Sequence, residues 1–183
     1  MNAPNTLTVF RILLVPVLMV FLLTDFRGHE LAALGIFLLA MLTDAVDGVL
    51  ARLTGTVTEL GKLLDPIADK LLLTAAFVCL VEAGSVPAWM AVVIIGRELA
   101  VTGFRAIAAS KGVVIAANWP GKMKVWFESA AIVLLLIEPK RLGSFAQAPR
   151  IILWLAMTVA VLSAVEVFIK YGSRLIRPES GRA

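Results

Sequence analysis

The chain has 183 residues, of which 60% are hydrophobic and 16% are charged, and its formal net charge is +4. Soluble domains carry roughly 25% charged residues, so a chain this poor in charge could not cover its apolar surface in water, and lipid must be the solvent for most of it. The excess of Lys and Arg lies beside apolar runs. This pattern indicates an anionic membrane surface as the partner of the basic residues and argues against nucleic acid.

Six apolar stretches follow one another along the chain, each near the 20 residues that a membrane-spanning helix needs. Turn-forming or charged segments separate them. The sequence therefore predicts an all-α integral membrane protein, a six-transmembrane-helix bundle formed by a single domain over residues 1–183. Residues 1–6 form a short cytoplasmic segment before the first helix, and residues 172–183 form a polar C-terminal tail. The predicted spans cover residues 7–25, 32–53, 67–83, 87–109, 123–138 and 150–170.

The basic residues are distributed unevenly about these six spans. If the N-terminus is cytoplasmic, 13 of the 17 Lys and Arg residues fall at the cytoplasmic ends. Lys and Arg are enriched in cytoplasmic loops, so this bias predicts that both termini are cytoplasmic. The exceptions, on the opposite side, are Arg27, Lys140, Arg141 and Arg150.

Four of the five aspartates fall within 26 residues, at the end of the second span and just before and within the third. Asp44 and Asp47 are three residues apart and Asp65 and Asp69 are four apart, so on helices each pair shares a face. A carboxylate near hydrocarbon costs about 2.5–3.5 kcal/mol, which calls for a compensating charge. Four oxygen ligands at one point suit hard divalent cations such as Mg²⁺ or Mn²⁺. For any one aspartate taken alone, a helix contact or a proton path is an alternative.

Small and basic residues accompany these acids at fixed spacing. The string Asp44-x-x-Asp47-Gly48-x-x-Ala51-Arg52, followed after eight residues by Gly61-x-x-x-Asp65-x-x-x-Asp69, resembles the signature of the CDP-alcohol phosphotransferases at every defined position. This resemblance implies a six-helix membrane fold, a homodimer, two metal ions and the release of CMP.

Segments outside the signature resemble the phosphatidylglycerophosphate synthase branch of that family: residues 5–11, 64–70, 96–105 and 119–124. That likeness implies transfer of the phosphatidyl group from CDP-diacylglycerol to sn-glycerol 3-phosphate, on the cytoplasmic side of a bacterial inner membrane. Members that use phosphatidylglycerol, giving cardiolipin, or inositol phosphate share the aspartate signature, so these acceptors stay open. An ion-coupled transporter is the alternative from a different functional class, because it too carries acids within the membrane.

The same resemblance assigns roles to individual residues. Asp44, Asp47 and Asp65 would bind the first metal ion, and Asp47, Asp65 and Asp69 the second. Asp69 would also be the catalytic general base. The residues expected to bind CDP-diacylglycerol are Asn5, Thr8, Asp44, Gly48, Ala51, Arg52 and Thr58. Asn5 and Thr8 are equally suited to capping the first helix.

Four basic residues lie in or beside apolar helices further along the chain: Arg97, Arg105, Lys122 and Lys124. Arg97 and Arg105 are eight residues apart and share a helix face. Arg offers a fork of N–H donors to phosphate oxygens and Lys a point charge, so we expect these residues to bind the phosphate of the acceptor. Snorkelling to the membrane edge and the charge bias of topology are the alternatives.

Overall fold

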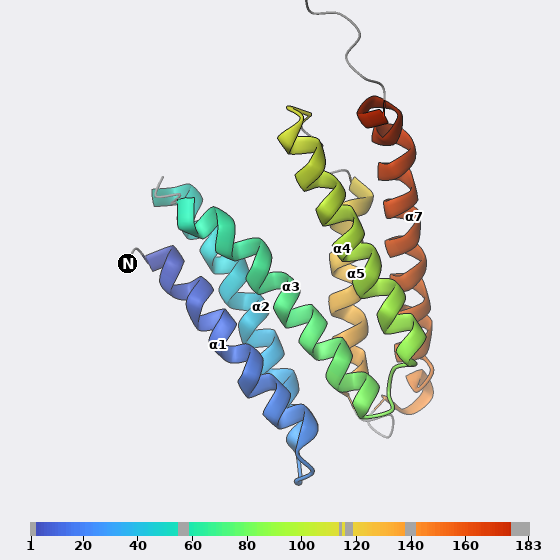
Figure 1. Cartoon of the computed structure of the whole chain (residues 1–183). Helices are drawn as coiled ribbons and strands as arrows, with labels where there is room; N and C mark the ends of the chain where they lie inside the picture. The colour runs from blue at the N-terminus through green and yellow to red at the C-terminus, as the bar shows by residue number, and fades with distance from the viewer. Residues whose placement is uncertain (1–2, 55–58, 114, 116–118, 138–141, 177–183) are drawn as a thin grey trace, which may run out of the picture. The chain divides into compact units, whose positions relative to one another are not determined.

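The computed structural model describes residues 3–54, 59–113, 115, 119–137 and 142–176, and all regular structure in these ranges is helical. Its six α-helices confirm the all-α prediction, and each predicted span overlaps one helix. The helix containing Asp65 and Asp69 begins at Glu59, eight residues before the apolar run predicted it to begin. The elements are α1 (Ala3–Leu23), α2 (His29–Thr54), α3 (Glu59–Glu82), α4 (Ala88–Ser110), α5 (Trp119–Leu135), the 3₁₀ turn η1 (Gly143–Phe145) and α7 (Ala148–Ile176) (Figure 1).

Glycines in the left-handed conformation end two of these helices. Gly84 follows α3 with φ +71°, and Gly112 follows α4 with φ +74°. After α3, the N–H of Ser85 donates to the carbonyl of Leu80, and after α4 the N–H of Val113 donates to the carbonyl of Ala108. These bonds satisfy carbonyls that a helix end leaves without a partner, and glycine adopts the required φ without a steric cost.

The chain divides into two compact units. One contains residues 1–88 and 132–149, and the other contains residues 89–131 and 150–183. The first holds α1, α2 and α3, and the second holds most of α4, α5 and α7. The expectation of one domain over residues 1–183 stays a prediction.

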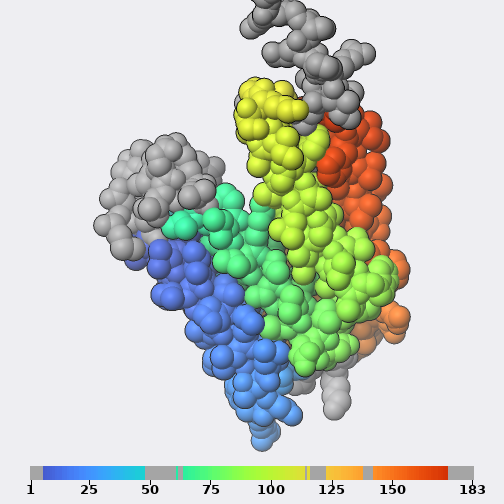
Figure 2. All heavy atoms as spheres, in the orientation of Figure 1, coloured from blue at the N-terminus to red at the C-terminus, as the bar shows by residue number. Residues whose placement is uncertain are grey.

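In the first unit, α1 contacts both α2 and α3. Helix α2 runs in the opposite direction to α1 and α3 (Figure 1). Figure 2 shows the side chains of α1 lying against those of α3 on the face drawn. The buried residues on α1 recur at helical spacing, through Leu14, Leu18 and Leu22, so one stripe of this helix faces its neighbours.

In the second unit, α4 packs against α7. Val101 of α4 forms a buried cluster with Ala164, Val167 and Tyr171 of α7. The rings of Phe104 and Phe168 meet edge to face beside it, with 4.8 Å between their centroids. Burial of apolar side chains therefore joins α4 to α7 over their C-terminal halves.

Three segments of the described chain are long and apolar enough to cross a membrane: Thr6–Leu23, His29–Asp47 and Gly143–Gly172. Large apolar side chains on these segments are exposed, among them Leu13 at 60% and Ile169 at 74%. Side chains this exposed suit contact with lipid acyl chains. The protein is therefore a membrane protein. Helices α3, α4 and α5 are not among these three segments, and their crossing of the membrane stays a prediction.

Candidate functional site

The candidate site lies in the first unit, where the buried faces of α1, α2 and α3 carry polar and charged side chains. On α1, the stripe of Leu22, Leu18 and Leu14 continues toward the N-terminus as Arg11 and Thr8, and both of these polar side chains are fully buried. Asp47, near the C-terminal end of α2, is also buried. The three helices therefore bury hydrocarbon along most of their contact and bury charge at one end of it.

Arg11 joins the two helices that carry the aspartates. Its Nη1 lies 2.9 Å from Oδ1 of Asp44 on α2 and 2.7 Å from Oδ1 of Asp69 on α3. The side chain of Arg11 is buried, whereas those of Asp44 and Asp69 are about half exposed. One guanidinium nitrogen thus lies between two carboxylates and bridges them as a cation.

Thr8 joins the other two aspartates. Its Oγ1 lies 3.1 Å from Oδ2 of Asp47 and 2.6 Å from Oδ1 of Asp65. A hydroxyl has one proton and can donate to only one of these carboxylates at a time. The pair Asp47 and Asp65 therefore has more acceptor capacity at this point than Thr8 alone can satisfy.

The four signature aspartates meet on α1. The guanidinium of Arg11 contacts two of them, Asp44 and Asp69, and Oδ1 of Asp47 is buried without a hydrogen-bond partner among the described residues. Within that part of the chain, no group of three or more acidic, His or Cys side chains is arranged to hold a metal ion. The donor set still fits divalent cations, because the ligands are hard carboxylate oxygens and one buried oxygen accepts no hydrogen bond from the described residues.

Several predicted donor-binding residues lie outside the described part of the structure. Thr58 falls in the segment 55–58, which is not described. Asn5 belongs to α1, and Gly48, Ala51 and Arg52 belong to α2, where the structure describes the helix but not these side chains. Their proposed roles therefore rest on their positions in the sequence.

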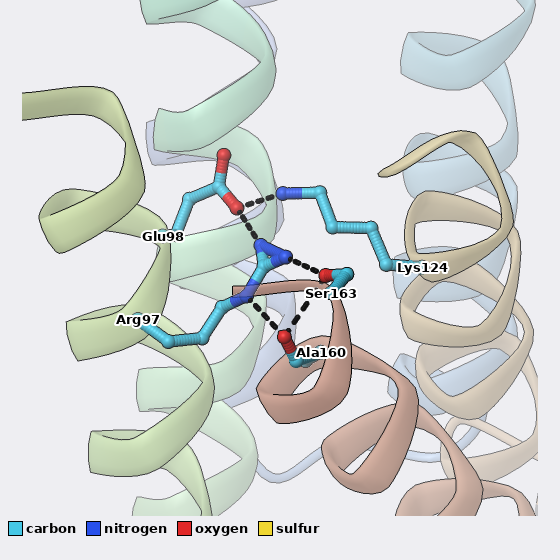
Figure 3. A network of polar contacts seen from close by, with 5 residues as sticks. All are labelled: Arg97, Glu98, Lys124, Ala160 and Ser163. Atoms are coloured by element: carbon cyan, nitrogen blue, oxygen red, sulfur yellow. Dashed lines mark hydrogen bonds and ion pairs between the residues drawn. The ribbon is translucent and has the colours of Figure 1, made fainter. Parts of the chain in front are cut away.

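The predicted acceptor-binding residues lie on α4 and α5 in the second unit, and two of them belong to one polar network (Figure 3). Arg97 donates from Nε to the carbonyl of Ala160 at 2.8 Å and from Nη2 to Oγ of Ser163 at 2.5 Å. Its Nη1 donates to Oε2 of Glu98 at 2.5 Å, and Nζ of Lys124 donates to the same oxygen. The structure thus brings Arg97 and Lys124 together through Glu98.

Arg105 and Glu128 lie outside this hydrogen-bonded network. Nε of Arg105 and Oε1 of Glu128 are buried and have no hydrogen-bond partner among the residues that the structure describes. Glu128 is 3% exposed. A buried polar atom without a partner costs free energy, so both atoms are candidates for contact with a bound group. For Lys122, on α5, the side chain lies outside the description.

Sequence analysis missed two residues of these arrangements, Arg11 and Glu98. Arg11 counts toward the charge bias and belongs to the stretch 5–11 that carries the resemblance, but no site role is predicted for it, although its position three residues after Thr8 places both on one face of α1. Glu98 is adjacent to Arg97 in the sequence, and no site role is predicted for it. The structure shows it as the shared acceptor of two cations.

Comparison with known proteins places the chain in a family. Residues 1–162 match the family model described as CDP-alcohol phosphatidyltransferase. The chain is 44% identical to the CDP-diacylglycerol–glycerol-3-phosphate 3-phosphatidyltransferase of Bacillus subtilis, over 92% of this chain and 94% of the relative. It is 33% identical to the protein of the same name from Rickettsia felis, over 91% and 93% of the two chains. It is 37% identical to the protein of that name from Pseudomonas fluorescens, over 76% of this chain and 74% of the relative.

Proposed function

Since the chain belongs to the CDP-alcohol phosphatidyltransferase family, we infer that it transfers the phosphatidyl group from CDP-diacylglycerol to sn-glycerol 3-phosphate. The products are phosphatidylglycerophosphate and CMP, so the protein is a transferase of phospholipid biosynthesis. Similarity to relatives named for this reaction, over more than nine-tenths of both chains, supports the inference. The observation that carries the chemistry is the meeting of four aspartates from α2 and α3 on Thr8 and Arg11 of α1.

Members of this family generally use divalent metal ions. We propose that Asp44, Asp47, Asp65 and Asp69 hold two ions, Mg²⁺ or Mn²⁺, because these acids supply hard, negatively charged oxygen ligands. When bound, such ions neutralise the pyrophosphate of the donor and stabilise the CMP leaving group.

The donor requires recognition of its nucleotide and its head group. We propose that Gly48, Ala51 and Arg52 on α2 face the nucleotide, with small side chains leaving room for the ligand. Asn5, Thr8 and Thr58 are proposed to contact the donor head group, as their positions in the family pattern indicate. Asp44 serves both the donor and the metal ions in this scheme.

The reaction forms one phosphorus–oxygen bond and breaks another. The primary hydroxyl of glycerol 3-phosphate attacks the phosphorus joined to diacylglycerol, and the bond from that phosphorus to the CMP oxygen breaks. We propose that Asp69 accepts the hydroxyl proton. Arg11 donates to Oδ1 of Asp69 and fixes its orientation, so this carboxylate keeps a second oxygen for the proton. Positioning of the two substrates supplies much of the remaining rate.

The acceptor is a phosphate ester, and the basic residues of α4 and α5 match it in charge. We propose that Arg97, Arg105, Lys122 and Lys124 provide the positive field for its phosphate. The Nε atom of Arg105 is buried and has no hydrogen-bond partner among the described residues, which supports this proposal because an anion would give that N–H group an acceptor.

The setting of the reaction is also a proposal. The bacterial relatives and the distribution of basic residues favour the inner membrane, with both termini and the active site on the cytoplasmic side. The family resemblance favours a homodimer in the bilayer.

The test of this function is a panel of acceptors. Purified protein with CDP-diacylglycerol and Mg²⁺ is given glycerol 3-phosphate, phosphatidylglycerol, inositol phosphate or serine, and CMP release is measured. We expect release with glycerol 3-phosphate and formation of an equal amount of phosphatidylglycerophosphate. Faster release with another acceptor would reassign the substrate. Absence of CMP with every acceptor would reject the transferase and favour the transporter.

A further inference from the structure

We propose that Ser163 on α7 is a positioning residue for the acceptor site, acting through Arg97 and Glu98 on Lys124. The inference rests on the proposed function, in which Lys124 binds the phosphate of glycerol 3-phosphate. It assigns the last helix, outside the aspartate signature, a part in acceptor specificity. It also assigns Arg97 an indirect role, holding other groups in place.

The hydroxyl of Ser163 has a fixed direction. Its Oγ donates its proton to the carbonyl of Ala160, one turn earlier on α7, at 3.0 Å. The lone pairs of the hydroxyl then remain for Nη2 of Arg97, which donates to it. The same Ala160 carbonyl accepts from Nε of Arg97, so Ser163 and Ala160 hold the guanidinium at two points (Figure 3). Two bonds to a planar group fix its orientation as well as its place.

Arg97 in turn fixes Glu98. The guanidinium donates from Nη1 to Oε2 of Glu98, and that oxygen also accepts from Nζ of Lys124. Figure 3 shows the other carboxylate oxygen of Glu98 pointing away from these contacts. The Lys124 ammonium is therefore linked to α7 through Glu98 and the guanidinium of Arg97.

Burial makes this chain of contacts specific. The side chains of Arg97 and Lys124 are 8% and 11% exposed, so water does not compete strongly for their N–H groups. A lysine has a long flexible stem, and a fixed partner is needed to hold its ammonium in one place. Three donors of Arg97 are engaged within the protein, which is why we place it behind the acceptor site rather than in contact with the phosphate.

The experiment measures kinetics for each substrate separately. Ser163→Ala removes the acceptor for Nη2, and we expect the KM for glycerol 3-phosphate to rise about tenfold, the effect of one hydrogen bond to a charged group. The KM for CDP-diacylglycerol and kcat are expected to stay within about twofold. Ser163→Thr keeps a hydroxyl that bonds to the preceding turn and should restore the acceptor KM.

A matched control is available on the same helix. Thr158 is exposed and donates to the carbonyl of Trp154, so Thr158→Ala removes the same kind of local bond without touching Arg97. We expect no change in either KM. An unchanged acceptor KM in Ser163→Ala would overturn the inference. Equal changes in both KM values and kcat would also overturn it, because they indicate general damage to the fold. A failure of Ser163→Thr to restore the acceptor KM would overturn it as well.

Glu98→Gln provides a second route that leaves α7 intact. If Ser163 acts through Glu98, the double variant should have nearly the acceptor KM of the more affected single variant. If the increases in acceptor KM of the two single variants instead multiply in the double variant, the two residues act independently, and the proposed chain of contacts is rejected. Wild-type protein in the same assay separates the two levels of inference. Its failure to use glycerol 3-phosphate would reject the proposed function, whereas normal wild-type turnover with an unaffected Ser163→Ala variant rejects only the role of Ser163.

Discussion

Asp69, like Asp44, is held by the guanidinium of Arg11 on a neighbouring helix. The buried Nη1 of Arg11 lies 2.7 Å from its Oδ1, while the side chain stays about half exposed. A carboxylate that is oriented by one oxygen and accessible at the other suits a group that takes a proton from a substrate hydroxyl. Asp44 shares this geometry, so the assignment of the base role to Asp69 rests on the family resemblance and stays a prediction.

Replacing Asp69 by Asn tests that role. The amide cannot accept the proton, so we expect CMP release to fall by at least about a hundredfold, the lower end of what a general base contributes. Binding of CDP-diacylglycerol, measured by titration calorimetry in detergent, should largely survive. Asp25→Asn is the control, because Asp25 is fully exposed beyond the end of α1. Normal turnover in Asp69→Asn would remove Asp69 from the base role.

Arg11 forms ion pairs with Asp44 and Asp69, and its replacement tests the electrostatics of the site. Arg11→Met keeps much of the side-chain volume but removes the guanidinium that contacts these two acids. Removing one partner of a buried pair costs about 3–5 kcal/mol, and the lower end applies because Asp44 and Asp69 are half exposed. For a chain of this size, about 3 kcal/mol lowers the unfolding midpoint by on the order of 6–12 °C.

The measurement is thermal unfolding in detergent with EDTA and then with excess Mg²⁺. We expect Arg11→Met to lower the unfolding midpoint less in Mg²⁺ than in EDTA, because a divalent cation at the acids supplies the missing positive charge. Arg27→Met is the control, since Arg27 is exposed between α1 and α2. Equal midpoints for Arg11→Met and the wild type in EDTA would show that Arg11 does not stabilise the acidic cluster.

At the scale of the helices, the sequence patterns predict that each helix exists more accurately than they predict where it begins and ends. Every predicted apolar span overlaps a helix, because a run of about 20 apolar residues has few other structures available in lipid. The start of α3 was predicted too late, at residue 67 rather than Glu59. The cause is that Glu59, Lys62 and Asp65 lie before the apolar run begins, while a helix that contacts a neighbour can hold a polar group such as Asp65 where that group finds a partner.

The partners that each site residue contacts were harder to predict from the sequence than which residues belong to the site. Spacing places Asp44 with Asp47 and Asp65 with Asp69, since it depends only on the helical repeat. The partners of these acids depend on how each helix is rotated about its axis toward its neighbour, which sequence spacing does not give. Thr8 was expected at the donor head group, and in the structure it lies between Asp47 and Asp65. Ser163 had no sequence signal at all, because a serine in an apolar helix is common.

For the whole molecule, the asymmetry of basic residues is the main guide to orientation. With both termini cytoplasmic, 13 of 17 Lys and Arg residues lie on the cytoplasmic side. Three segments are long and apolar enough to cross by composition alone. Helices α3 and α4 carry charged site residues, so their crossing depends on burying those groups within the protein rather than in lipid.

Cysteine labelling tests the crossings directly. The chain has one cysteine, Cys79, which is buried, so Cys79→Ala gives a background without thiols. Single cysteines replace three exposed residues in connections between helices: Arg27 before α2, Ser85 before α4 and Lys111 after it. If every helix crosses with the N-terminus inside, Arg27→Cys and Ser85→Cys face outward and Lys111→Cys faces the cytoplasm.

A maleimide that cannot cross the membrane should therefore label Arg27→Cys and Ser85→Cys in intact spheroplasts and Lys111→Cys only after lysis. The position at Ser85 is decisive, because α3 and α4 flank it. If these two charged helices stayed on the cytoplasmic surface, Ser85→Cys would be protected together with Lys111→Cys while Arg27→Cys was still labelled. That outcome would reject the six-helix topology. Labelling of Lys111→Cys alone before lysis would instead invert the orientation and place the aspartates on the outer side.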